Sequence, residues 1–215
     1  MVHGLDASGK DNLIRTLATH MDPAGFHAWS FSRPTENEAR HDFLWRVTPR
    51  LPGFGEVAAF NRSHHESVIA EQAWPVRQTP PVDPEERYDS LRHFEKHLSR
   101  EGTGIIKCWL HLSEAEHRKR LNKRLDKAHK RWKFDPSDID AWQRRRDELL
   151  SYAQQAIAAT HIREAPWHII PADNKSDARS IVAGLLAERL QTLAPEYPSH
   201  DKALISHYRA LLNNE

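Results

Sequence analysis

A short run near the start of the chain combines glycines and a lysine at a spacing that suits phosphate binding. It reads Gly4-Leu5-Asp6-Ala7-Ser8-Gly9-Lys10, in the form GxxxxGK. In such a loop the backbone N–H groups surround phosphate oxygens, and the helix that follows presents its positive N-terminal end to the anion. Glycine allows the backbone conformations that the loop needs. The residues expected to contact phosphate are Gly4, Ala7, Ser8, Gly9 and Lys10.

Two acidic residues depart from the usual loop. Asp11 follows Lys10, where a serine or threonine normally holds magnesium. Asp6 lies inside the loop, where a carboxylate would repel phosphate unless it binds a metal ion or accepts a proton. Asp6 is therefore a candidate metal ligand or general base. The alternative is an aspartate that only stabilises a turn.

A second polar group follows the apolar run at residues 57–60. P-loop enzymes usually place a magnesium-associated aspartate at the end of another strand, and here Asn61 occupies that place. An amide oxygen can bind Mg²⁺ but lacks the charge. Arg62 would reach a phosphate, and Glu66 could restore an acid one helical turn later. The alternative is a strand that ends in an ordinary polar turn.

A strongly basic stretch covers residues 118–133, with nine lysines and arginines and one acid, Asp126. Arg120, Arg124, Lys127 and Arg131 fall within reach of one helical face. Such a face suits a polyanion, and in phosphotransferases a mobile basic lid closes over the phosphates. A solvated surface helix is the main alternative. A nucleic-acid patch is disfavoured, because the whole chain is nearly neutral, with 31 basic and 30 acidic side chains.

Composition bounds the class of protein. A length of 215 residues suits one domain. The single cysteine, Cys108, cannot form an internal disulfide, and no apolar run reaches the roughly 18–20 residues that cross a bilayer. We expect a soluble cytoplasmic protein without a membrane partner. The 15 histidines are scattered and predict no metal site.

Short β-like runs alternate with longer helical ones, which favours an α/β fold with a parallel sheet and helices on both faces. The expected strands are residues 26–31, 56–61, 104–112 and 167–171. The expected helices are residues 9–20, 36–47, 84–99, 113–125, 137–160 and 176–193, with a further amphipathic helix around 202–212. Because only three residues precede Gly4, a strand of the usual length of about five does not fit before the loop.

Taken together, these residues resemble the polyphosphate kinase 2 family. The loop matches its G-x-D-A-x-G-K pattern, and the strand end matches F-[DN]-R-S at Phe60-Asn61-Arg62-Ser63. Further matches are Pro34-Thr35, the lid residues Arg120, Arg124, Lys130, Trp132, Lys133, Pro136 and Asp138, and the late segments Ala165-Pro166-Trp167 and Ala172-Asp173-Asn174-Lys175. His65 and Asn12 depart from the pattern, which usually has another aromatic residue and a glycine there.

The resemblance implies a three-layer α/β/α P-loop kinase-like domain over residues 1–195, with a helical lid at about 117–140 and a peripheral tail at 196–215. It implies Mg²⁺-dependent, reversible phosphoryl transfer between inorganic polyphosphate and AMP or ADP, with ATP among the nucleotides, in a homo-oligomer that binds no nucleic acid. The implied catalytic residues are Asp6, Lys10, Asn61, Arg62 and Glu66, with Asp6 and Asn61 as metal ligands. The implied polyphosphate-binding side chains are Lys10, Arg62, Arg120, Arg124, Lys130 and Lys133.

Two other functions remain open at this point. An ATP-dependent nucleotide kinase would share the loop and the lid, although one triphosphate needs fewer cations than the lid offers. A truncated, non-catalytic polyphosphate-binding module would share the basic surface, and Asn61 in place of aspartate fits it.

Overall fold

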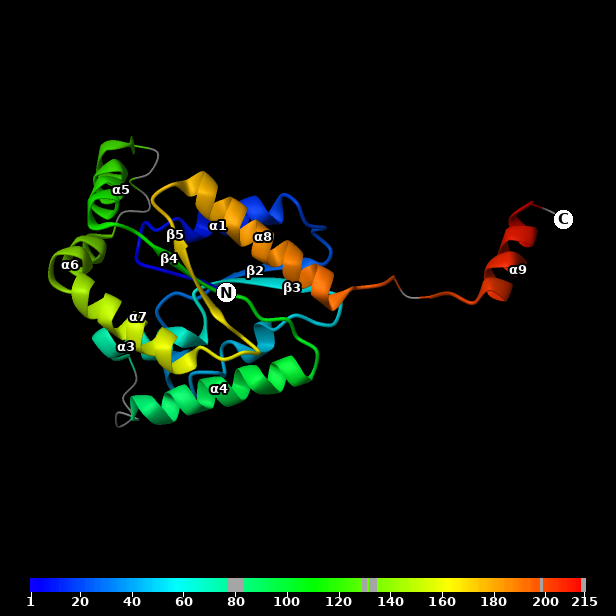
Figure 1. Cartoon of the computed structure of the whole chain (residues 1–215), viewed down its shortest axis with the longest axis horizontal. Coiled ribbons are helices and arrows are strands. Elements are labelled where there is room, and N and C mark those ends of the chain that lie inside the picture. The colour runs from blue at the N-terminus through cyan, green and yellow to red at the C-terminus, as the bar shows by residue number, and fades with distance from the viewer. Residues whose placement is uncertain (77–82, 129–130, 132–134, 198, 214–215) are drawn as a thin grey trace.

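A parallel sheet forms the centre of the molecule. The structure, a computed structural model of the chain, describes residues 1–76, 83–128, 131, 135–197 and 199–213. The strands are β1 (Val2–His3), β2 (Phe26–Ser30), β3 (Val57–Asn61), β4 (Lys107–His111) and β5 (Trp167–Pro171). Their order is β2-β3-β1-β4-β5, and every pairing is parallel (Figure 1). The predicted parallel sheet is confirmed, and β5 has the expected bounds.

The strand before the loop is short, as expected, yet it is central. Val2 of β1 lies opposite Asn61 on one side and Cys108 on the other. The backbone contacts extend beyond the strand, because Cys108 N–H donates to the Met1 carbonyl and Arg62 N–H donates to the Val2 carbonyl. The loop that begins at Gly4 therefore leaves the sheet between β3 and β4.

Helices connect the strands. The α-helices are α1 (Lys10–Ala18), α2 (Glu36–Ala39), α3 (Ala70–Ala73), α4 (Pro84–Arg100), α5 (Glu114–Asp126), α6 (Pro136–Arg144), α7 (Arg146–Thr160), α8 (Lys175–Leu193) and α9 (Lys202–Asn213). Two 3₁₀ turns, η1 (Thr48–Arg50) and η2 (His64–Val68), complete them. Neither η2 nor α3 was expected from the sequence.

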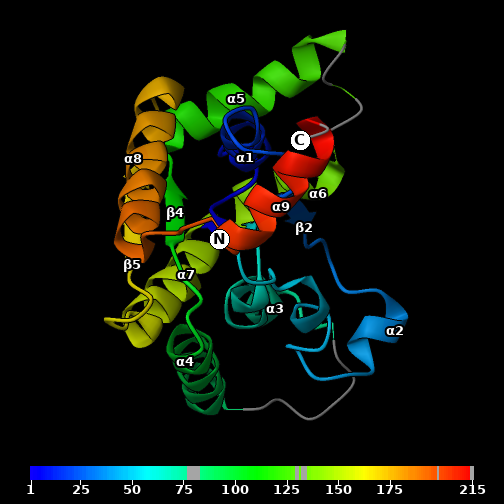
Figure 2. The ribbon, with the colours of Figure 1, turned by 90° about the vertical axis from the view of Figure 1, so that its right-hand side faces the viewer.

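The helices form two layers, one on each face of the sheet. Figure 1 shows α1 and α8 on one face and α4 and α7 on the other, and Figure 2 shows the same layers after a quarter turn. Leu13 of α1 and Val182 of α8 pack with Leu110 in one core cluster. Leu91 of α4 and Ala156 of α7 pack in a second cluster on the opposite face. Burial of apolar area on both faces holds the short β1 in place.

Two helix predictions were wrong in extent. The expected helix 36–47 ends at Ala39, and Asp42 Oδ1 then accepts the backbone N–H groups of Leu44 and Trp45. An aspartate that binds nearby backbone N–H groups competes with helix continuation. The expected helix 137–160 divides at Arg145, whose backbone (φ −128°, ψ 3°) leaves the helical region. The Arg145 guanidinium donates to the Ala73 carbonyl and so ties the break to α3.

The last helix stands apart from the sheet. In Figure 1, α9 lies away from the sheet and from the other helices, and it contains no buried residue. Within the described part of the chain, no helix combines the length and apolarity needed to cross a bilayer.

Candidate functional site

The loop between β1 and α1 is held open by three residues in the left-handed region. Their φ angles are 141° at Gly4, 61° at Ala7 and 108° at Gly9. Gly4 has a second constraint, because a Cβ atom there would lie 2.7 Å from the Leu110 carbonyl oxygen. The loop therefore requires glycine at this position for both its conformation and its close contact with β4.

Lys10 lies at the centre of the loop. Its Nζ donates to the carbonyl oxygens of Gly4 (2.7 Å) and Leu5 (3.0 Å). The pKa of Lys10 is lowered to about 8, chiefly by burial and also by the charge of Arg62, while the charges of Asp6 and Glu66 oppose the shift. The ammonium and the N-terminal end of α1 thus face the same space, as an anion site requires.

Asp6 and Arg62 form an ion pair across the loop. Arg62 Nη2 lies 2.7 Å from Asp6 Oδ1, and both side chains are partly exposed. Burial alone would raise the pKa of Asp6, but the charges of Arg62 and Lys10 outweigh it and hold that pKa below its ordinary value. Arg62 itself has φ of 64°, an uncommon conformation for a residue with a side chain. This backbone turn places an ionised carboxylate and a guanidinium together at the end of β3.

Asn61 contacts an acid that the sequence analysis treated only as a departure. Asn61 Nδ2 donates to Asp11 Oδ1 at 2.5 Å, which fixes the orientation of the amide. The other amide atom, Asn61 Oδ1, is buried and has no hydrogen-bond partner among the described residues. The sequence feature that could have identified Asp11 as a site residue is its position directly after Lys10 at the start of α1. This helix packs over β3, the strand that ends at Asn61.

Arg120, in the middle of the basic helix α5, binds the protein itself. Its Nη1 donates to the carbonyls of Ser8 (2.8 Å) and Ala7 (3.4 Å), and its Nη2 donates to those of Ala172 (2.6 Å) and Asp173 (2.9 Å). Its Nε donates to Glu116 Oε1 (2.8 Å). All five N–H groups of the guanidinium thus have protein acceptors. In this geometry Arg120 connects the lid helix to the phosphate loop, and it has no N–H group left for phosphate.

Two cavities meet at Asp6 and Arg62. The first, of about 660 Å³, contains the phosphate loop and a set of basic side chains. These are Lys10, Arg15, Arg62, Arg120, Lys123, Arg124 and Lys175. The second, of about 520 Å³, is lined by Gly4, Glu66 and apolar side chains such as Phe43, Ile69 and Trp74. Arg15, Lys123 and Lys175 were not expected from the sequence.

The structure brings most of the expected site residues together. Those that line the first cavity are Asp6, Ala7, Ser8, Gly9, Lys10, Asn61, Arg62, Arg120 and Arg124. Gly4 and Glu66 line the second cavity. Lys130 and Lys133 lie outside the described residues.

The first cavity has a donor set that fits magnesium. Asp6, Asp11 and Asn61 all line it and offer carboxylate and amide oxygens, the ligands that Mg²⁺ prefers. The buried Asn61 Oδ1 lacks a protein partner, as a metal ligand or an acceptor from metal-bound water would. The residues present therefore fit Mg²⁺.

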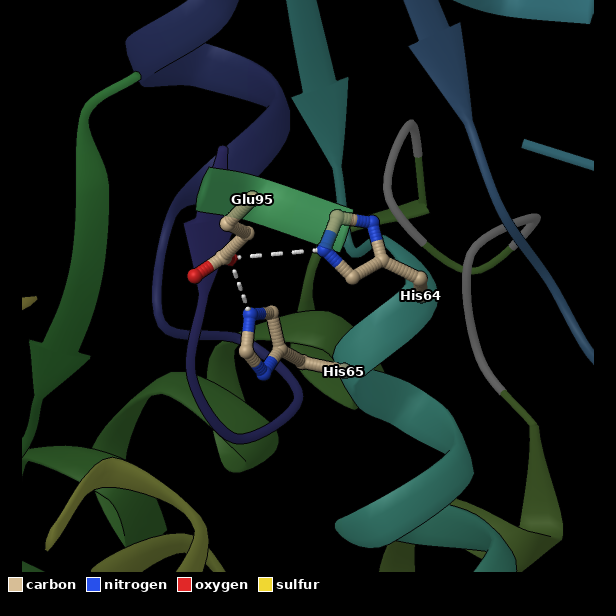
Figure 3. A group of neighbouring side chains, drawn as sticks. All are labelled: His64, His65 and Glu95. Carbon is tan, nitrogen blue, oxygen red and sulfur yellow. Dashed lines mark hydrogen bonds and ion pairs between the residues drawn. The ribbon is translucent and has the colours of Figure 1, made fainter. Parts of the chain in front are cut away.

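A second cluster, unexpected from the sequence, does not fit a cation as well. Figure 3 shows the Glu95 carboxylate between two imidazoles, with Oε1 at 2.7 Å from His65 Nε2 and 3.4 Å from His64 Nε2. The other oxygen, Oε2, accepts a hydrogen bond from Lys107 Nζ at 2.5 Å. Burial lowers the pKa of both histidines, that of His65 to about 3, so both are neutral. Glu95 and Lys107 already balance each other, and a divalent cation would lie beside an ammonium.

A parallel sheet with a phosphate loop after its central strand, and cations gathered above that loop, defines a P-loop kinase-like protein. Comparison with known proteins narrows the class. Residues 1–198 match the family model described as polyphosphate kinase 2. The chain therefore belongs to the polyphosphate kinase 2 family.

Two named relatives and one solved structure are similar to the chain over most of its length. The chain is 38% identical to the ADP-polyphosphate phosphotransferase of Rhodopseudomonas palustris, over 90% of this chain and 70% of that protein. It is 39% identical to the AMP/ADP-polyphosphate phosphotransferase of Meiothermus ruber, over 94% of this chain and 75% of that protein. The crystal structure of polyphosphate kinase 2 from Arthrobacter aurescens TC1 superposes with a TM-score of 0.91 at 33% identity, covering all of this chain and 74% of that one.

Proposed function

We propose that this protein transfers a phosphoryl group reversibly between inorganic polyphosphate and AMP or ADP, with Mg²⁺. The observation that carries the proposal is the pair of cavities that share Asp6 and Arg62. One is lined by cations and suits a linear polyanion, and the other is partly apolar and suits a nucleotide. The relatives in Rhodopseudomonas palustris and Meiothermus ruber, whose names give polyphosphate with ADP or with AMP and ADP, support the same pairing.

In the proposed reaction, polyphosphate occupies the first cavity. The backbone N–H groups of the loop and Lys10 bind the phosphate that is transferred, and Arg62 stabilises charge that develops on it. Arg124 and Lys123, on the helix that starts the lid at 117–140, neutralise the remaining chain. Asp6, Asp11 and Asn61 would hold Mg²⁺, which supplies further neutralisation of phosphate charge when bound. The affinity for polyphosphate should fall steeply as the salt concentration rises.

The nucleotide occupies the second cavity in this proposal. Phe43 and Trp74 offer apolar and aromatic surface to a base, and the acceptor phosphate points towards Asp6. The ionised Asp6 orients this phosphate or accepts a proton from it. Transfer is direct and in line, with no covalent enzyme intermediate, so positioning provides most of the rate. Residues 1–195 would act as one catalytic domain.

The test is nucleotide formation from polyphosphate and Mg²⁺, with AMP and with ADP supplied separately. We expect Lys10→Ala and Asp6→Asn each to lower turnover by at least about a hundredfold while the protein stays folded. Lys119→Ala is the control, because Lys119 is a highly exposed lysine on the basic helix α5 that does not line the first cavity. Normal turnover in either site variant contradicts the proposal. Product only with ATP as donor identifies a nucleotide kinase, and polyphosphate binding without product identifies a binding module.

A further inference from the structure

We propose that His3 is a positioning residue that holds the Glu66 carboxylate towards the nucleotide cavity and away from the phosphate-binding cations. This inference rests on the proposed function for the role of the second cavity. His3 is the last residue of β1 and directly precedes Gly4. It therefore connects the start of the phosphate loop to an acid on η2.

The imidazole of His3 is fully buried and makes two side-chain hydrogen bonds. Nδ1 lies 2.9 Å from Glu66 Oε1, and Nε2 lies 2.9 Å from Ser63 Oγ. The rings of His65 and Trp167 contact it edge-on, with centroids 5.9 Å and 5.4 Å away. Two hydrogen bonds and two ring contacts leave the imidazole one orientation.

The chemistry of the partners also fixes its protonation. Burial lowers the pKa of His3, so the ring is neutral and carries one N–H. A carboxylate can only accept, so the proton is on Nδ1 and is donated to Glu66. Nε2 then accepts from the Ser63 hydroxyl, whose oxygen in turn accepts the backbone N–H of His65 at 3.3 Å. The hydrogen bonds run in one direction and end at Glu66.

Glu66 needs such a restraint because cations surround it. Its side chain is 21% exposed and lines the second cavity. Burial would raise the pKa of Glu66, but the hydrogen bond from His3 and the charges of Arg62 and Lys10 hold it below its ordinary value. A carboxylate released from His3 would be drawn towards those two cations, which the proposed reaction needs for phosphate.

Two substitutions separate the two hydrogen bonds of His3. In His3→Asn the amide N–H takes the place of Nδ1–H and can still donate to Glu66. In His3→Gln the longer side chain reaches Ser63, as Nε2 does, and loses the donor at the Nδ1 position. We expect His3→Gln to lower kcat/KM for AMP and ADP on the order of tenfold or more, and His3→Asn to retain most of the activity. Both variants should unfold at similar temperatures.

The effect must act through Glu66. In a Glu66→Gln background, His3→Gln should cause no further loss, which a double-mutant cycle measures. A full additional loss there, or equal activity of His3→Gln and the wild type, overturns the inference.

A readout independent of turnover separates this inference from the proposed function. ¹⁵N NMR of histidine-labelled protein should show His3 as the neutral Nδ1–H tautomer, assigned by the signal that His3→Gln removes and perturbed by Glu66→Gln. An Nε2–H or charged His3 overturns the inference even if the enzyme is active. Absence of transfer in the wild type refutes the proposed function, and the NMR result then still decides whether His3 holds Glu66.

Discussion

Replacement of Arg120 by lysine tests whether this arginine connects the lid to the loop or binds phosphate. The guanidinium reaches three separate parts of the chain from α5, namely the loop carbonyls of Ala7 and Ser8, those of Ala172 and Asp173, and Glu116 on its own helix. A lysine keeps the charge, but its single ammonium cannot reach all of these acceptors.

The size of the effect follows from the contacts. Arg120→Lys loses about two or three of the five hydrogen bonds, each worth about 1 kcal/mol net, so we expect a loss of about 2–3 kcal/mol in the free energy of unfolding. For a chain of this size that corresponds to a decrease in Tm of roughly 4–12 °C. These values apply to the protein without substrate.

The assay is urea and thermal unfolding in the absence of any phosphate. Arg118→Lys is the matched control, because Arg118 is an arginine on the same helix with a mostly exposed side chain that pairs with Glu114 and lies over the Trp142 ring, two contacts that the lysine ammonium can still make. The control should change stability by no more than about 0.5 kcal/mol. If Arg120→Lys is as stable as the control and instead loses polyphosphate affinity, Arg120 is a phosphate ligand and our interpretation of its geometry is wrong.

Two further predictions concern the Asp11–Asn61 pair and the buried His65. Asp11→Asn should weaken the binding of Mn²⁺, used as a substitute for Mg²⁺ and measured by EPR, by about tenfold. The double variant Asp11→Asn/Asn61→Asp exchanges the amide and the carboxylate and should restore most of the Mn²⁺ affinity. No recovery of affinity would show that the pair does not hold the metal. His65 titrates near 6.5 when unfolded but, with its pKa lowered to about 3 by burial, stays neutral in the folded protein. The unfolded state therefore binds more protons between those values, so this histidine makes stability fall by about 1.4 kcal/mol per pH unit as pH decreases from 6.5. His65→Phe should remove that increment from the slope measured by urea unfolding at pH 6 and 5, and an unchanged slope would contradict the pKa direction.

Local sequence patterns predicted the phosphate loop and the parallel sheet. The spacing from Gly4 to Lys10 identified the loop, and residues 167–171 were placed correctly as a strand, because turn residues and apolar runs act over a few positions. The prediction of a helix over 36–47 was wrong beyond Ala39, because Asp42 Oδ1 accepts the backbone N–H of Leu44 and forms a turn there.

The side-chain contacts that define the site were not predicted from the sequence. His3 meets Glu66 across 63 positions, and Asn61 meets Asp11 across 50. Such pairs depend on which strands are neighbours, and the strand order is set by packing of the whole sheet. The residue types alone identified Asn61 and Glu66 as candidates, but their partners required the fold.

The position of Cys108 makes the centre of the sheet observable in solution. This thiol is 1% exposed, lies in β4 directly beside Val2 of β1, and is the single cysteine of the sequence. A reagent can reach it only when β4 and its neighbours separate, and burial also raises its pKa, which slows reaction further. The rate of thiol labelling thus reports how often the strand that supports the phosphate loop opens, and a bound polyanion that closes the site should slow it.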